Sequence, residues 1–126
     1  MRKKSLTKTL WKRAFRAAER SMIAFVNRRD KHCQLCKSTF ILQSDHAIVS
    51  RRHLATFFEV KAQVLLCSKC HLKKTFNQHG LPVAVAAIVA EREGMTYVDW
   101  VIAESRKIKK YTLQELEDLT KEFNSQ

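Results

Sequence analysis

Two pairs of cysteines are the most specific chemical feature of this sequence. Cys33 pairs with Cys36 and Cys67 with Cys70, each with two residues between them, and the chain has four cysteines in all. A Cys-x2-Cys turn presents two thiolates to one ion, and zinc prefers four soft ligands in a tetrahedron. The spacing therefore predicts one structural Zn²⁺ held by all four cysteines. A redox dithiol and buried free cysteines are the alternatives, and two matched pairs argue against both.

Three polar residues lie between and beside these pairs. Asp45 and His46 are adjacent at the end of an expected strand, and His71 follows the second pair at the start of an expected helix. A carboxylate and an imidazole can hold a hard divalent ion on a phosphate, while another neutral imidazole takes a proton from water. This combination is suited to phosphodiester hydrolysis. Taken singly, His71 could instead be a spare zinc ligand and Asp45 a turn or cap residue.

The charge of the chain indicates the class of its partner. Among 126 residues, 24 Lys and Arg stand against 12 Asp and Glu, a net charge of +12. Residues 1–90 hold 18 basic and 4 acidic residues, whereas residues 91–126 hold 6 and 8. A localised excess favours a polyanion, above all DNA, over charge that serves solubility alone. The basic residues expected to contact DNA are Lys8, Lys12, Arg13, Arg16, Arg20, Arg51, Arg52, Lys69, Lys73 and Lys74.

Several helices and a few short strands must position these groups. Residues 5–29 have the apolar periodicity of one long amphipathic helix, whose basic face would contact DNA phosphates or merely be solvated. The apolar segments 40–42 and 44–49 predict two strands of a hairpin. A short buried run over 64–66 leads to the second cysteine pair, and residues 71–76 predict a helix.

The last third of the chain predicts helices over 83–93 and 97–105 and from a capping box at Thr112 and Glu115 through about Phe123. We expect this region to serve packing or dimerisation, so that a homodimer is possible. The expected organisation is a basic N-terminal helix over 1–31, a zinc-stapled core over 32–80 and a helical region over 81–126, forming one compact unit. No apolar run has the length of a membrane span and no secretion signal is evident, so we expect a cytoplasmic protein without a membrane partner.

The pattern over residues 32–76 resembles the HNH, or ββα-metal, nuclease superfamily in its zinc-stapled form. The residues that carry the resemblance are Cys33-x2-Cys36, Asp45-His46 and Leu66-Cys67-x2-Cys70-His71-x2-Lys74-Thr75. The flanking segments 25–30 and 110–116 resemble the NinG/Rap recombination endonucleases of lambdoid phages. The resemblance implies an α+β fold, a small ββα-metal core with a structural zinc flanked by the basic N-terminal helix and the C-terminal helices.

The resemblance also implies a role for each matching residue. The four cysteines would hold zinc, Asp45 and His71 would bind a catalytic Mg²⁺ or Mn²⁺, and His46 would be the general base. The middle Asn of the superfamily, which orients the base, is replaced by Ala62 here. Gln63 or His53 could take its place. The implied substrate is branched DNA, such as Holliday junctions and D-loops in phage recombination, and a phage-encoded protein would act in the host cytoplasm.

Three functions therefore compete. The first is a metal-dependent DNA endonuclease acting on branched recombination intermediates. The second is a general HNH nicking endonuclease with less structural selectivity. The third is a zinc-containing DNA-binding accessory protein without catalysis, which the Ala62 substitution favours slightly. Retention of Asp45, His46 and His71 together argues against the third.

Overall fold

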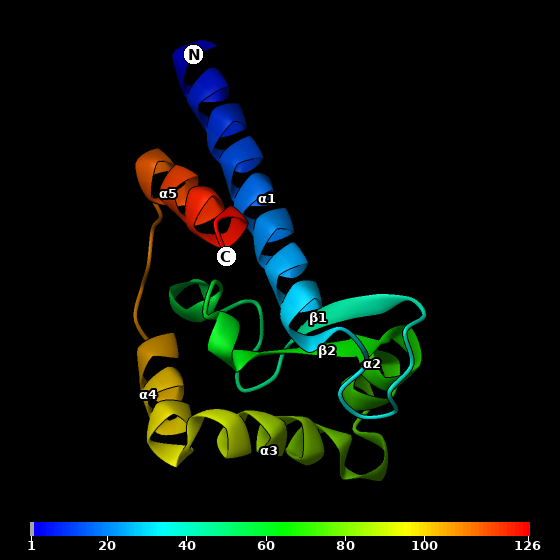
Figure 1. The fold of residues 1–126 in the computed structure, drawn as a ribbon. Helices are drawn as coiled ribbons and strands as arrows, with labels where there is room; N and C mark the ends of the chain where they lie inside the picture. The colour runs from blue at the N-terminus through cyan, green and yellow to red at the C-terminus, as the bar shows by residue number, and fades with distance from the viewer. Residues whose placement is uncertain (1) are drawn as a thin grey trace. The chain divides into compact units, whose positions relative to one another are not determined.

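The computed structural model describes the backbone of residues 2–126 and the side chains from residue 5 onward, and it has a mixed α and β fold (Figure 1). It has five α-helices among these residues: α1 (Arg2–Asp30), α2 (Ser68–Thr75), α3 (Leu81–Glu93), α4 (Met95–Ser105) and α5 (Leu113–Asn124). The strands β1 (Leu42–His46) and β2 (Gln63–Cys67) form an antiparallel sheet. Short 3₁₀ turns are η1 (Leu54–Thr56), η2 (Val60–Ala62) and η3 (Gln78–Gly80).

The described chain divides into two units that are each compact. One unit joins α1 up to Phe25 with the segment Lys110–Gln126, and the other comprises Val26–Lys109. The sequence predicted one compact unit of three consecutive segments. The structure differs because the region 81–126 is divided: α3 and α4 belong with the cysteine-containing core, whereas α5 packs on α1.

The first unit is held by aromatic contacts between α1 and the C-terminal segment. The indole N–H of Trp11 donates to the Tyr111 carbonyl oxygen at 2.7 Å, and the rings of Phe25 and Phe123 lie 6.2 Å apart. The helix α5 begins at a capping box in which Thr112 and Glu115 each bind the other's backbone N–H, as the sequence predicted.

The second unit contains the sheet, whose register pairs Asp45 with Val64 and His46 with Gln63. The predicted hairpin within residues 40–49 is wrong, because these residues contribute the single strand β1 and its partner is β2. Phe40 and Ile41 are exposed, and Ile41 has a positive φ of 50° that starts the chain on its turn into β1. The partner strand is the buried run around Val64–Leu66, and residues in all five of its positions are buried.

The helices α2, α3 and α4 complete the second unit. The α3 side chains Val85 and Val89 are fully buried in a cluster that contains Val64, Leu66 and Cys33. The helix α1 ends at Asp30, and α3 ends before Gly94, at the positions the sequence predicted. Among the described residues, no helix combines the length and the hydropathy that crossing a membrane requires.

Candidate functional site

The four cysteines converge at the end of the sheet. There β2 continues directly into α2 (Figure 1). Their sulfur atoms all lie within 4.8 Å of one another, and the Sγ atoms of Cys36 and Cys67 are 3.5 Å apart. A tetrahedral zinc with Zn–S bonds of about 2.3 Å separates its sulfurs by about 3.8 Å. The donor set therefore fits one zinc ion, as the spacing predicted.

Local backbone geometry forms the two halves of this cluster. The N–H of Cys33 donates to the Ser38 carbonyl oxygen at 2.8 Å, which closes the first turn. Cys67 is the N-cap of α2, and its sulfur accepts the Cys70 N–H at 3.5 Å. Each pair is thus held on a tight turn that points two thiols the same way.

Two cysteines of the cluster, Cys33 and Cys70, have pKa values shifted in opposite directions. Burial acts to raise the pKa of Cys33, but N–H groups of Cys36, Cys67 and Leu35 stabilise its thiolate and lower the pKa to about 6. Burial, followed by its hydrogen bonds to neighbouring cysteines, raises the pKa of Cys70. One thiolate is therefore available near neutral pH, and a bound cation would displace the remaining protons.

Asp45, His71 and Lys74 form a second polar cluster beside the cysteines. The Asp45 side chain is only 4% exposed, and its Oδ1 lies 3.1 Å from Nδ1 of His71. Its other oxygen accepts from the Lys74 ammonium group at 2.7 Å, and Lys74 also donates to the His46 carbonyl oxygen at 3.0 Å. The structure thus brings the predicted pair of Asp45 and His71 together, and it adds a cation to them.

His46 is fixed by the loop that joins the two strands. Its Nε2 lies 3.1 Å from the Phe57 carbonyl oxygen, and the two rings are 4.9 Å apart. Because a carbonyl oxygen can only accept, Nε2 carries the proton. In the neutral ring the lone pair is therefore on Nδ1, which is the atom able to take a proton.

Gln63 supports this arrangement from the opposite strand. It is fully buried, its Nε2 donates to the same Phe57 carbonyl oxygen at 3.3 Å, and its Oε1 accepts from the Ser44 hydroxyl at 2.9 Å. Ala62, at the position of the expected Asn, is buried, and His53 is exposed in the turn before η1. Of the two possible replacements, Gln63 is the one that shares a partner with His46.

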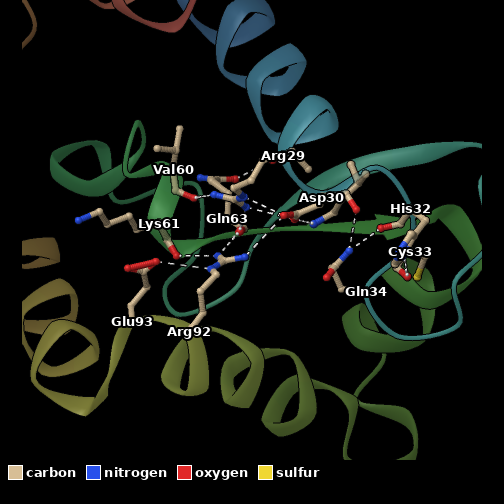
Figure 2. Close-up of polar contacts among 12 residues, drawn as sticks. Arg29, Asp30, His32, Cys33, Gln34, Val60, Lys61, Gln63, Arg92 and Glu93 are labelled. Atoms are coloured by element: carbon tan, nitrogen blue, oxygen red, sulfur yellow. Dashed lines mark hydrogen bonds and ion pairs between the residues drawn. The ribbon is translucent and has the colours of Figure 1, made fainter. Parts of the chain in front are cut away.

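A network of charged residues holds the backbone of Gln63 in place (Figure 2). The Gln63 carbonyl oxygen accepts from Arg29 at 2.6 Å and from Arg92 at 2.9 Å. The buried Asp30 carboxylate binds the Arg29 guanidinium at 2.7 Å and accepts the Leu65 N–H at 3.0 Å. Burial, followed by the neighbouring charge of Arg29, lowers the pKa of Arg92. The ends of α1 and α3 are thereby tied to the start of β2.

The structure places the predicted DNA-contacting residues in three regions. On α1, Lys8, Lys12, Arg13, Arg16 and Arg20 are all exposed. Arg51 and Arg52 are exposed in the turn before η1, and the Arg51 guanidinium lies 5.6 Å from the centre of the Phe57 ring. On α2, Lys69 and Lys73 are exposed, whereas Lys74 is half-buried on Asp45. Lys74 is therefore the one residue of the predicted ten whose side chain is not exposed.

The sequence did not indicate two contacts of this site. The first is the ion pair of Lys74 with Asp45. The signal available for it was the i, i+3 spacing of His71 and Lys74, which places both side chains on one face of α2. The Phe57 carbonyl was not foreseen, because it depends on the path of a 16-residue loop between His46 and Gln63. A buried polar Gln in an otherwise apolar strand was the available signal for this second contact.

Comparison of the chain with models of protein families, with curated proteins and with solved structures finds no match. Among the described residues, the four cysteines are the one group of three or more His, Cys, Asp or Glu side chains placed to hold a metal ion. The geometry of this second unit therefore carries the functional argument.

Proposed function

We propose that this chain is a metal-dependent DNA endonuclease of the HNH type, with a preference for branched recombination intermediates. The observation that carries the proposal is the approach of Asp45 and His71 to 3.1 Å, beside His46 and directly after the cysteine cluster. Residues 26 apart in the sequence meet because β1, β2 and α2 pack together. A sheet and helix that bring a carboxylate and an imidazole together, with a second imidazole on the next residue of the strand, are suited to phosphodiester hydrolysis.

Asp45 and His71 would hold the catalytic Mg²⁺ or Mn²⁺. Two adjacent ligands of an octahedral ion with bonds of about 2.1 Å are about 3.0 Å apart, close to the separation of Oδ1 and Nδ1 here. Such an ion usually takes one or two protein ligands and completes its shell with water and substrate phosphate. When bound, it would polarise the scissile phosphate and stabilise the leaving oxygen.

His46 would serve as the general base. Its Nε2–H is held by the Phe57 carbonyl oxygen, so that Nδ1 accepts a proton from the attacking water. Gln63 holds the same carbonyl from the other strand and so keeps the imidazole in one orientation. Gln63 would thus do the work that an Asn performs in the superfamily, and we identify it as a positioning residue.

The exposed basic side chains of α1 and α2 favour contact with the phosphate backbone over base readout. Binding of this kind depends on the shape and charge of DNA, which suits a branched substrate. A homodimer would allow both strands of a junction to be cut symmetrically. The preference for branched DNA rests on the resemblance of the flanking segments to NinG/Rap endonucleases.

Cleavage of a labelled four-way junction, beside a linear duplex of matched arms, tests the proposal. The zinc-loaded protein is assayed in Mg²⁺, in Mn²⁺ and without added divalent ion, together with His46→Ala and the control His79→Asn, whose side chain is exposed in η3. We expect metal-dependent cutting that His46→Ala abolishes while junction binding persists. Equal cutting of both substrates would indicate a general nicking endonuclease, and unchanged cutting by His46→Ala would refute the base assignment.

The ion pair of Lys74 with Asp45 favours a second candidate function, a zinc-containing DNA-binding accessory protein. A lysine ammonium 2.7 Å from the carboxylate opposes binding of a second cation there. Junction binding without cutting in either metal, by protein with one zinc per chain, would support this candidate over the nuclease.

A further inference from the structure

A cleft lies between the turn before η1 and the segment that follows α4. Its volume is about 480 Å³. Its lining comprises Arg52, His53, Leu54, Ser105, Arg106, Lys107, Ile108 and Lys109. The two walls are about fifty residues apart in the sequence, and packing of α4 against η1 brings them together.

The cleft is strongly basic. Four of its eight lining residues are Arg or Lys, a fifth is His53, and none of the lining residues is acidic. An acidic neighbour is Glu104 on α4, whose carboxylate lies 2.8 Å from the Lys107 ammonium group. Lys107 remains 68% exposed in this pair, so its charge still faces solvent. Such a surface attracts an anionic partner, which would offset the repulsion among its cations.

Two apolar side chains lie among these cations. Ile108 is 94% exposed and Leu54 is 38% exposed. The segment from Ile108 to Tyr111 has neither helix nor strand, so its side chains are carried on an irregular backbone at the surface. A nucleic-acid strand offers both kinds of surface, since its phosphates are anionic and its sugars present apolar faces. Inorganic phosphate would use the cations alone.

The cleft is connected to the proposed active site through one short turn. The N–H of Phe57 donates to the Leu54 carbonyl oxygen at 3.2 Å, and that of Thr56 to the His53 carbonyl oxygen at 3.2 Å. The Phe57 carbonyl oxygen in turn holds His46. Phe57, whose carbonyl oxygen holds the proposed base His46, therefore lies three residues after Leu54 in the wall of the cleft.

We infer that this cleft binds the phosphate backbone of the DNA substrate beside the point of cleavage. The inference rests on the proposed function for the position of the cut, while the binding itself can be measured alone. Arg52 and the cations at 106, 107 and 109 contact phosphates from two sides, and Ile108 packs on a sugar. The sequence carries a signal for this surface in the run Arg106-Lys107-Ile108-Lys109-Lys110, an island of positive charge in an otherwise acidic region.

Binding of a fluorescent four-way junction across a range of salt concentrations tests the inference. The triple variant Arg106→Gln, Lys107→Gln, Lys109→Gln is compared with a control that removes the same charge elsewhere, Lys37→Gln, Lys61→Gln, Lys121→Gln. The control residues are all exposed and lie outside the cleft. No Mg²⁺ or Mn²⁺ is added, so cutting does not interfere, and circular dichroism verifies that both variants are folded.

We expect the cleft variant to weaken junction binding at least about tenfold at physiological salt. The slope of log K against log salt should flatten by about 0.9 for each phosphate that the variant no longer neutralises. The control should change both quantities by much less. Equal effects of the two variants would overturn the inference, because net charge alone would then explain binding. Retained DNA binding together with abolished binding to vesicles of anionic phospholipid would also overturn it and assign the cleft to a membrane surface.

The cleavage assay separates this inference from the proposed function. A wild-type protein that binds but does not cut, with the cleft variant impaired in binding, would support the DNA-binding cleft and refute the nuclease. A protein that cuts equally well with and without the three cleft charges would refute the cleft and leave the nuclease standing.

Discussion

His46 and Gln63 share one hydrogen-bond acceptor, the carbonyl oxygen of Phe57, at 3.1 Å and 3.3 Å. They are also direct partners in the register of the two strands. The shared acceptor means that the side chain of Gln63 and the imidazole of His46 are restrained by the same peptide group. This relationship gives the buried glutamine a role beyond filling the core.

Gln63→Met keeps the volume of the side chain and removes both of its hydrogen bonds. We expect kcat for DNA cleavage to fall about tenfold or more while junction affinity and KM stay unchanged, because the imidazole loses its restraint but the side chains proposed to contact DNA are all retained. The free energy of unfolding should fall by about 1–3 kcal/mol, since the Ser44 hydroxyl loses its hydrogen-bond partner. The same substitution at the exposed Gln43 on β1 is the control. A fall in affinity without a fall in kcat would contradict the positioning role.

Lys74→Met removes the ammonium group from Asp45 and leaves the stem of the side chain. We expect half-maximal cleavage at a lower Mn²⁺ concentration, because a competing cation 2.7 Å from the carboxylate is gone. The exposed neighbour Lys73→Met is the matched control on α2. If the Mn²⁺ requirement of Lys74→Met is unchanged or rises, Asp45 does not bind the ion competitively with Lys74.

The zinc content of the purified protein should be one ion per chain. Cys67→Ser should lose that ion and fail to fold, because the cluster joins β2, α2 and the turn at Cys33. Lowering the pH should also release zinc, since protons compete for the thiolates. Zinc analysis and thermal melts measure both effects, with Ser68→Ala as the control. A Cys67→Ser protein that melts like the parent would show that the cysteines are not a structural metal site.

Asp30→Asn tests the charged network behind β2. The carboxylate is buried and paired with Arg29. Its loss leaves the positive charge of the Arg29 guanidinium without its anionic partner. We expect a loss of about 3 kcal/mol in the free energy of unfolding, measured with urea. Asp99→Asn on the exposed face of α4 should have little effect. Similar unfolding midpoints for these two variants would show that the network contributes little to stability.

The Tyr97 hydroxyl donates to Glu59 at 3.0 Å, and burial, followed by the charge of Glu59, raises the pKa of the phenol. The folded state therefore keeps a proton that the unfolded state loses above its ordinary pKa near 10. Stability from this group is present below about pH 10 and declines as the pH rises beyond it. Urea unfolding at several alkaline pH values should show a smaller decline for Tyr97→Phe than for the parent. Tyr111→Phe is the control, and parallel declines in Tyr97→Phe and the parent would contradict the assignment.

Periodicity and caps were sufficient to predict most helices, and the spacing of the cysteines was sufficient to predict their cluster. The end of α1 at Asp30, the end of α3 at Glu93 and the capping box at Thr112 follow from local rules that the structure obeys. The four cysteines were found by spacing alone, because the turn that each pair forms is short. These features need no knowledge of the tertiary fold.

Strand pairing was not predictable in the same way. Phe40-Ile41 has the composition of a strand, yet both side chains are exposed, whereas the true partner of β1 lies across a 16-residue loop. Composition reports that a segment can be extended, and only packing decides what it pairs with. The position of the Phe57 carbonyl and the meeting of residues 52–54 with 105–109 depend on that packing too.

The order of residues along α2 links the two chemical sites. Cys70 is a buried member of the sulfur cluster, and His71, one residue later, turns about 100° around the helix to meet Asp45. A single helical turn thus carries one cysteine of the cluster and the proposed ligand of the second ion, so the length of the bonds from a metal to these sulfurs would set the rotation and height of the imidazole. Cadmium in place of zinc, with its longer bonds to sulfur, would shift this turn and so, under the proposed function, slow DNA cleavage without altering Asp45, His46 or His71.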